Sequence, residues 1–185
     1  MAEIVTMGEI MLRLSPPEHQ RFIQATSFDI NYGGSEGNIA VCLSNYGHNV
    51  GYITKLPKNE IGECVIATLQ KYGVDCSAIT RGGNRLGIYF LENGSSVRPS
   101  SVIYDRAGSS MAESTVDDFD FETTLKDIKW FHTSGITPAL NKKVAEATKK
   151  AMIIAKKNGN NLFHLGNAPS FWSNNLSEML IQQAV

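Results

Sequence analysis

The sequence has no strong excess of either charge and no long apolar run. Lys and Arg number 17, Asp and Glu number 18, and the formal net charge is −1. This balance gives no electrostatic reason to expect a nucleic acid or an anionic membrane as partner. No apolar stretch approaches the roughly 20 residues that a membrane-spanning helix needs. The first residues include an acid and no basic region, so no signal peptide is expected. We therefore expect a soluble globular chain of one domain.

Cysteine is scarce, and the sequence contains no recognisable metal site. Cys42, Cys64 and Cys76 are odd in number and form no C-x-x-C pair, so we expect reduced thiols and a cytoplasmic location. The four histidines fit no metal spacing. The acidic stretch at residues 117–122 lacks the glycine and the glutamate that a calcium loop needs at its sixth and twelfth positions. No metal ligand is therefore predicted.

Hydrophobic periodicity predicts alternating strands and helices. Buried strands are expected over residues 4–7, 50–54, 130–133 and 162–165, and helices over residues 36–46, 61–72 and 141–157, with a last helix after Ser173. The core-facing stripes predicted for the first three helices are Ile39, Ala40, Leu43 and Tyr46; Ile61, Val65, Leu69 and Tyr72; and Val144, Ala147, Ala151 and Ile154. This order favours an α/β fold with a mostly parallel sheet flanked by helices.

Two further pairs of strands depart from this pattern. Residues 10–14 and 28–32, and later residues 87–92 and 102–106, form short segments that partly alternate apolar with polar side chains. We expect them to form a small β-sheet apart from the body, approximately within residues 10–32 and 87–106. A cleft between two such parts is a common place for a ligand.

Gly33 and Gly34 stand between a predicted strand and a predicted helix. Glycines there let the backbone approach a ligand closely, and the free N–H groups of a helix N-terminus can bind oxygen-rich or anionic groups. The same two residues would equally make a tight strand-to-helix turn. The spacing G-G-x-x-G, followed about twenty residues later by Lys55 and not by an acid, does not fit a dinucleotide site. A Walker A loop is excluded because the sequence has no Gly-Lys pair.

Tyr104 and Arg106 stand two residues apart on the last of these strands and are expected to point the same way. An Arg side chain can hold a carboxylate or phosphate through two parallel hydrogen bonds, and a Tyr hydroxyl can add a third. Tyr89, on the neighbouring strand, either joins this face or simply packs. A Tyr and an Arg exposed on a strand are more often only part of the surface.

Five motifs agree in order and spacing with those of one family. They are residues 8–16 (GEIMLRLSP), 32–40 (YGGSEGNIA), 56–62 (LPKNEIG), 104–109 (YDRAGS) and 132–140 (HTSGITPAL). By these motifs the chain resembles the ribokinase-like (PfkB) carbohydrate kinases, and most closely the 2-keto-3-deoxygluconate kinases, of which Glu36 is typical. The similarity covers nearly all of residues 3–157.

The resemblance implies a large α/β body with a small β lid that covers the sugar and often forms a dimer interface. It implies transfer of the γ-phosphoryl group of ATP, with Mg²⁺, to a hydroxyl of a sugar or sugar acid. It also implies that Arg106 faces the substrate carboxylate. The substrate-binding residues expected on this basis are Gly33, Gly34 and Asn38 from the body and Tyr89, Tyr104 and Arg106 from the lid.

Two departures from the family pattern qualify this expectation. The sequence has no match to the G-A-G-D-type motif that carries the family's catalytic base, so no catalytic residue and no nucleotide-binding residue is identified. At residues 163–172 (FHLGNAPSFW), where relatives read close to F-D-x-N-Y-R-x-x-L-W, His164 takes the place of the acid and Ala168 that of the arginine.

We therefore interpret residues 1–185 as the N-terminal part of one ribokinase-like domain, supplying the lid and half of the sugar pocket. One alternative is a non-catalytic protein that binds a sugar acid or dimerises through its lid. Another is a kinase with fructokinase or ribokinase specificity.

Overall fold

The structure is a computed structural model that describes residues 2–165, of which residues 163–165 by their backbone alone. The helix predicted after Ser173 and most of the segment 163–172 lie outside the described residues. The elements are β1 (Ile4–Met7), β2 (Met11–Ser15), η1 (Phe22–Gln24), β3 (Asp29–Gly33), α1 (Ser35–Asn45), β4 (Val50–Ile53), β5 (Lys55–Leu56), α2 (Glu60–Lys71), β6 (Thr80–Arg81), β7 (Ile88–Glu92), β8 (Ser101–Asp105), η2 (Val116–Asp118), α3 (Phe121–Thr124), β9 (Trp130–Ser134), α4 (Lys142–Lys157) and β10 (Asn161–Leu165).

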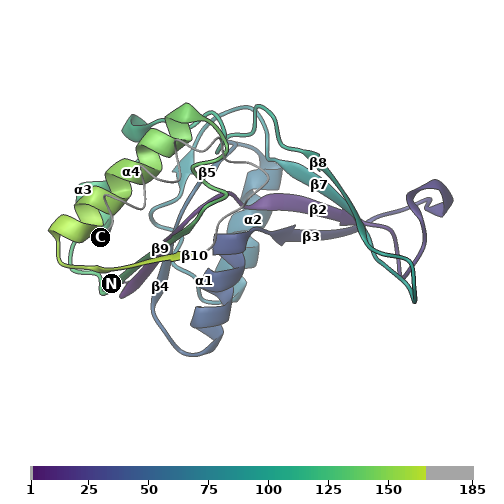
Figure 1. Cartoon of the computed structure of the whole chain (residues 1–185), viewed down its shortest axis with the longest axis horizontal. Helices are drawn as coiled ribbons and strands as arrows, with labels where there is room; N and C mark the ends of the chain where they lie inside the picture. Colours follow the sequence, from purple (N-terminus) through teal and green to yellow (C-terminus); the bar gives the residue numbers. More distant parts are fainter. Residues whose placement is uncertain (1, 166–185) are drawn as a thin grey trace.

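The body is built on a four-stranded sheet, here called sheet A, in the order β10-β9-β1-β4 with every neighbouring pair parallel. Helix α4 covers one face and α1 covers the other (Figure 1). Because side chains alternate along a strand, Val5 and Met7 pack into the hydrophobic cluster beneath α4, whereas Ile4 packs into the cluster beneath α1 and α2. This confirms the predicted parallel sheet with flanking helices.

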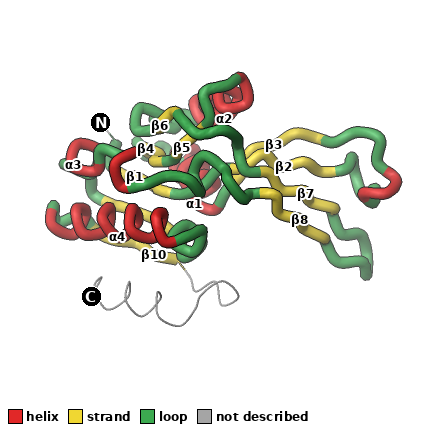
Figure 2. The backbone as a smooth tube through the Cα atoms, turned by 90° about the horizontal axis from the view of Figure 1, so that it is seen from above, coloured by secondary structure: helices red, strands yellow, loops and turns green. Residues whose placement is uncertain are grey.

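A second four-stranded sheet, sheet B, has the order β3-β2-β7-β8. The pairs β2–β3 and β7–β8 are antiparallel, and β2–β7 is parallel. Sheet B extends away from the body, and its far end lies well beyond α1 and α2 (Figures 1 and 2). The chain thus leaves the body twice, first after β1 and again after β6, as the interrupted pattern of the sequence predicted.

The helix ends follow ordinary capping chemistry. The Oδ1 atom of Asn141 accepts hydrogen bonds from the N–H groups of Lys143 (2.9 Å) and Val144 (3.2 Å) at the start of α4. Gly47 and Gly73 follow α1 and α2 with positive φ angles of 87° and 77°, where glycine ends a helix without strain. All four residues predicted to face the core from α4 are buried.

Two predicted helix stripes are wrong at their ends. Ala40, Val65 and Leu69 are buried, but Tyr46 is 78% exposed, and Ile61 and Tyr72 are each 42% exposed. Tyr46 lies past the last residue of α1, and Ile61 and Tyr72 lie in the first turn of α2 and just past its last residue. These three residues are not part of the hydrophobic core.

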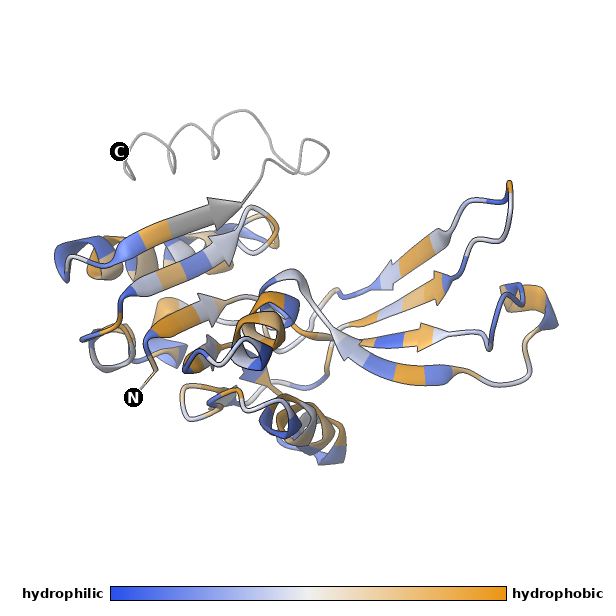
Figure 3. Cartoon of the chain, turned by 90° about the horizontal axis from the view of Figure 1, so that it is seen from below, coloured by the Kyte–Doolittle hydropathy of each residue, from blue (hydrophilic) through white to orange (hydrophobic). Residues whose placement is uncertain are grey.

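The face of sheet B that the alternating pattern predicted to be packed is also partly exposed. Phe28 is 39% exposed and Ile30 is 63% exposed. The strands of sheet B carry apolar segments where they stand away from the helices of the body (Figure 3). The pattern therefore predicted the strands, but not what covers them.

Candidate functional site

The body and sheet B meet at a cavity of about 180 Å³. Its walls come from the β1–β2 loop, the β3–α1 junction, β7, the end of β8 and the segment after β9. It is lined by Glu9, Met11, Gly33, Gly34, Ser35, Glu36, Asn38, Tyr89, Tyr104, Arg106, Ile136 and Thr137. All six residues predicted to bind substrate belong to this set, so the fold brings together residues that lie up to 73 positions apart in sequence, from Gly33 to Arg106.

Gly33 and Gly34 form the junction between sheet B and the body. Gly33 is the last residue of β3, and Gly34 is the N-cap of α1. The backbone at Gly34 is extended (φ −172°), a conformation open to any residue, so close packing is what requires a glycine there. A β-carbon at position 34 would lie 2.1 Å from the carbonyl oxygen of Glu9. The N–H of Asn38, one turn along α1, donates to the carbonyl oxygen of Gly34 at 2.8 Å. The junction is both a tight turn and a wall of the cavity.

Tyr89, Tyr104 and Arg106 form the wall contributed by sheet B. Tyr89 and Tyr104 are direct partners in the β7–β8 register, and their ring centroids lie 5.9 Å apart. The guanidinium carbon of Arg106 lies 5.8 Å from the centroid of the Tyr104 ring, within the range of a cation–π contact. Arg106 follows the last residue of β8, so the strand ends one residue earlier than predicted.

Arg106 already has a carboxylate partner within the protein. Its Nε donates to the Oε2 atom of Glu9 at 2.8 Å, and its Nη2 donates to the same oxygen. The other carboxylate oxygen of Glu9 accepts a hydrogen bond from the Ser109 hydroxyl. The Glu9 side chain is 3% exposed and that of Arg106 is 22% exposed. A buried charge needs such partners, because an unpaired carboxylate would be costly in this environment.

A second buried carboxylate, Glu36, closes the body side of the cavity. Its Oε1 atom accepts hydrogen bonds from the N–H of Ser134 (2.9 Å) and the hydroxyl of Thr137 (3.0 Å). Glu36 is 2% exposed and lies in the first turn of α1, where the helix dipole favours a negative charge. It fixes the segment after β9, including the cavity residue Thr137, against the start of α1.

Tyr52 supports the loop between β1 and β2. Its hydroxyl donates to the carbonyl oxygen of Gly8 at 2.9 Å. Burial raises the pKa of Tyr52 well above its usual value, and the nearby carboxylates of Glu36 and Glu9 raise it further. The phenol therefore stays neutral and remains a hydrogen-bond donor to the loop that carries Glu9.

Sequence reasoning gave no role to Glu9 and treated Glu36 only as a subgroup marker. A signal for Glu9 was present, because it directly follows the short buried strand β1 and its Gly8. Ligands of open α/β sheets bind at the carboxyl ends of the strands. An acid at that position was therefore a candidate, although its partners could not be read from the sequence.

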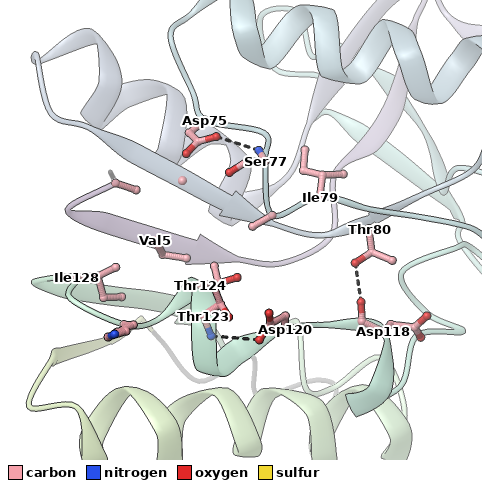
Figure 4. A pocket seen from close by; sticks show the side chains of 14 residues that line it. Val5, Asp75, Ser77, Ile79, Thr80, Asp118, Asp120, Thr123, Thr124 and Ile128 are labelled. Atoms are coloured by element: carbon pink, nitrogen blue, oxygen red, sulfur yellow. Dashed lines mark hydrogen bonds between the residues drawn. The ribbon is translucent and has the colours of Figure 1, made fainter.

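A larger hollow of about 470 Å³ lies between β4, the segment before β6 and α3 (Figure 4). Its acidic side chains accept hydrogen bonds from nearby backbone and side-chain groups. Asp75 accepts from the N–H of Ser77 (2.9 Å), and Asp120 accepts from the N–H of Thr123 (3.1 Å). Asp118 accepts from Lys55 Nζ at 2.6 Å. None of the predicted site residues lines this hollow.

Over residues 2–165 the structure contains no group of three or more His, Cys, Asp or Glu side chains that could hold a metal ion. In the same part of the chain, no helix combines the length and the apolar character needed to span a membrane.

Comparison with known proteins gives consistent matches. The model of the pfkB family carbohydrate kinases matches residues 1–184. The chain is 36% identical over 173 residues to a 2-dehydro-3-deoxygalactonokinase of Haloferax volcanii, covering 93% of this chain and 54% of that protein. It is 35% identical over 160 residues to a 5-dehydro-2-deoxygluconokinase of Clostridium perfringens, covering 85% and 46%.

The fold matches solved structures as well. The crystal structure of a 2-dehydro-3-deoxygluconokinase of Thermotoga maritima superposes with a TM-score of 0.93 at 43% identity, covering 99% of this chain and 56% of that one. A PfkB family carbohydrate kinase of Listeria grayi gives a TM-score of 0.91 at 37% identity, covering 97% and 57%. The chain thus spans about half the length of the relatives that it matches.

Proposed function

Since the chain belongs to the pfkB family of carbohydrate kinases, we propose that its substrate is 2-keto-3-deoxygluconate or a closely related sugar acid. The intact reaction would transfer the γ-phosphoryl group of ATP, with Mg²⁺, to a hydroxyl of that sugar. The names of its relatives support a deoxy-keto sugar acid as the substrate class. A cytoplasmic location fits this proposal, because all three cysteines are free thiols.

The observation that carries the proposal is the convergence of six predicted residues on one cavity that contains a guanidinium group. In this proposal Arg106 binds the carboxylate of the sugar acid, since paired N–H donors match a carboxylate in charge and shape. The glycines at positions 33 and 34 let the sugar approach the backbone closely. Asn38 and Tyr89 supply hydrogen bonds to its hydroxyl groups.

We assign neither the nucleotide nor the metal a site in the described part of the chain. No acidic cluster over residues 2–165 fits Mg²⁺, and the sequence has no Walker A loop. We therefore assign these residues to the binding and orientation of the sugar. When bound, ATP would supply the phosphoryl group, and Mg²⁺ would neutralise its negative charge.

Calorimetric titration of the chain with 2-keto-3-deoxygluconate tests this proposal, with ATP turnover in the presence of Mg²⁺ measured in parallel. We expect sugar-acid binding that weakens by about tenfold or more in Arg106→Ala, because charge-assisted hydrogen bonds are lost. Arg85→Ala is the matched control, since Arg85 pairs with Asp105 through two 2.8 Å contacts and does not line the cavity. No binding by the wild type, or an equal loss in both variants, would contradict the proposal.

We also propose that sheet B acts as the lid over the sugar and as the contact surface of a homodimer. One row of apolar side chains crosses all four strands on the face opposite the cavity, through the register pairs of Ile30, Leu14, Phe90 and Ile103. Ile30 and Ile103 are 63% and 53% exposed, and exposed apolar rows of this kind favour association. Sedimentation should show that the wild type is a dimer and that Ile30→Asp is a monomer. A monomeric wild type would exclude this contact.

A further inference from the structure

The carboxylate of Glu9 contacts two segments that are far from it in the sequence, residues 106–109 and Gly87. Arg106, at the end of β8, and Ser109, three residues later, donate to its two oxygens. Gly87, just before β7, packs against it so closely that a β-carbon there would lie 2.7 Å from Oε1. Glu9 itself belongs to the body, in the loop between β1 and β2. Its side chain therefore joins the body to the base of sheet B at the edge of the cavity.

The geometry of the Arg106 pair leaves part of the guanidinium available. A guanidinium has five N–H donors arranged along a planar fork. Glu9 takes one from Nε and one from Nη2, so three remain, one on Nη2 and two on Nη1. Within residues 2–165 these three donate to no other group. The Nη1/Nη2 edge can bind a second carboxylate through two parallel bonds while Glu9 keeps the first edge.

We propose that Glu9 is a positioning residue for the recognition of the substrate carboxylate. By holding the Nε/Nη2 edge of Arg106, Glu9 leaves the adjacent Nη1/Nη2 edge for the substrate in the cavity, where the Tyr104 ring restricts the remaining rotation of the group. Ser109 fixes the second oxygen of Glu9 and so prevents the carboxylate from turning. This inference rests on the proposed function, because it assigns a purpose to the pair only if an anionic sugar binds at Arg106.

A competing arrangement makes the opposite prediction. If Glu9 were an internal competitor that the substrate must displace from Arg106, neutralising Glu9 would strengthen sugar-acid binding. If Glu9 positions Arg106, neutralising it weakens binding. The sign of the change in affinity therefore separates the two arrangements.

The first experiment needs no sugar. Phenylglyoxal labels arginine side chains, and peptide mass spectrometry gives the labelling rate at each position. We expect Glu9→Gln to raise the labelling rate of Arg106 by about fivefold, because losing the charge-assisted bonds from Glu9 leaves Nη2 less firmly held and more open to the reagent. Arg85, paired with Asp105, is the internal control and should label at an unchanged rate. An unchanged rate at Arg106 would overturn the inference, whatever the protein binds.

The second experiment is a double-mutant cycle on the binding of 2-keto-3-deoxygluconate. We expect Glu9→Gln to weaken binding on the order of tenfold in the wild type and to have almost no effect in the Arg106→Met background, since contacting residues that act as a unit are not additive. Equal losses in both backgrounds, or tighter binding by Glu9→Gln, would overturn the inference.

Two results keep these outcomes separate from misfolding and from failure of the proposed function. Ser109→Ala removes one hydrogen bond to Glu9 but leaves the Arg106 pair, so it should weaken binding in the same direction by a smaller factor even if Glu9→Gln proves unstable. If Arg106 labelling responds to Glu9→Gln but the wild type binds no sugar acid, the proposed function is wrong, and the recognition role of Glu9 is overturned with it.

Discussion

Gly34 packs so closely against the main chain of Glu9 that a β-carbon at position 34 would lie 2.1 Å from the Glu9 carbonyl oxygen. The same loop presents the Glu9 carboxylate to Arg106. This one backbone contact therefore fixes the β3–α1 junction relative to Glu9, the residue that pairs with Arg106. A change at Gly34 should affect the stability of the fold and the shape of the cavity together.

We predict that Gly34→Ala destabilises the protein by about 1–3 kcal/mol, because the new methyl group meets a backbone oxygen that can move only together with its loop. Sugar-acid binding should weaken as well, since the loop carrying Glu9 must shift. Urea denaturation measures the first effect and calorimetry the second.

Gly33→Ala is the matched control for this prediction. A β-carbon at position 33 would lie 3.3 Å from the Tyr89 hydroxyl and 3.5 Å from Asn38 Oδ1. Both atoms end side chains that can adjust, so the free energy of unfolding should fall by less than in Gly34→Ala. Equal losses would show that the contact with Glu9 is not what requires glycine at position 34.

Glu36 provides the second prediction. Glu36→Ala would leave the N–H of Ser134 and the hydroxyl of Thr137 without their acceptor and would open a cavity in the body. We expect a loss of about 2–5 kcal/mol in the free energy of unfolding. Glu36→Gln keeps an oxygen that can accept both bonds, so its loss should be clearly smaller. A Gln variant as unstable as the Ala variant would mean that the charge, and not the hydrogen bonds, stabilises this site.

The motif residues of the site could be predicted because their signals are local. Two glycines between a strand and a helix, and a Tyr and an Arg two residues apart on a strand, can be recognised from short windows of sequence. The roles of Glu9 and Glu36 depend on partners 97 to 101 residues away. No pattern in their own neighbourhood specifies those partners.

The same limit explains the errors in the fold. Helical periodicity correctly placed Ala40, Val65 and Leu69 on buried faces, because it tells which residues share a side of a helix. It does not tell how far the neighbouring sheet extends, and Tyr46 and Tyr72 lie beyond that cover. In sheet B, alternation predicted the strands, but the exposure of Ile30 depends on what packs against the sheet.

A third prediction concerns stability in acid. The carboxylate of Asp118 accepts hydrogen bonds from Lys55 Nζ (2.6 Å) and from the N–H of Thr115 (2.8 Å). Burial by itself raises the pKa of Asp118, but the bonds from Lys55 and Thr115 outweigh it, and the pKa lies below its usual value. The side chains of Lys55 and Asp118 are 13% and 22% exposed, so solvent screens the pair only partly.

A carboxyl group whose pKa is lower in the folded than in the unfolded state stabilises the fold above its unfolded pKa, and this contribution is lost as the pH falls through the folded pKa. We therefore expect Asp118→Asn to lower the free energy of unfolding by about 1.5–3 kcal/mol at pH 7. The difference from the wild type should shrink below about pH 4. Asp117→Asn is the control, since Asp117 is exposed and accepts no hydrogen bond in the described part of the chain. Urea titrations between neutral and acid pH measure both, and a constant difference for Asp118→Asn would mean that the pair with Lys55 adds no pH-dependent stability.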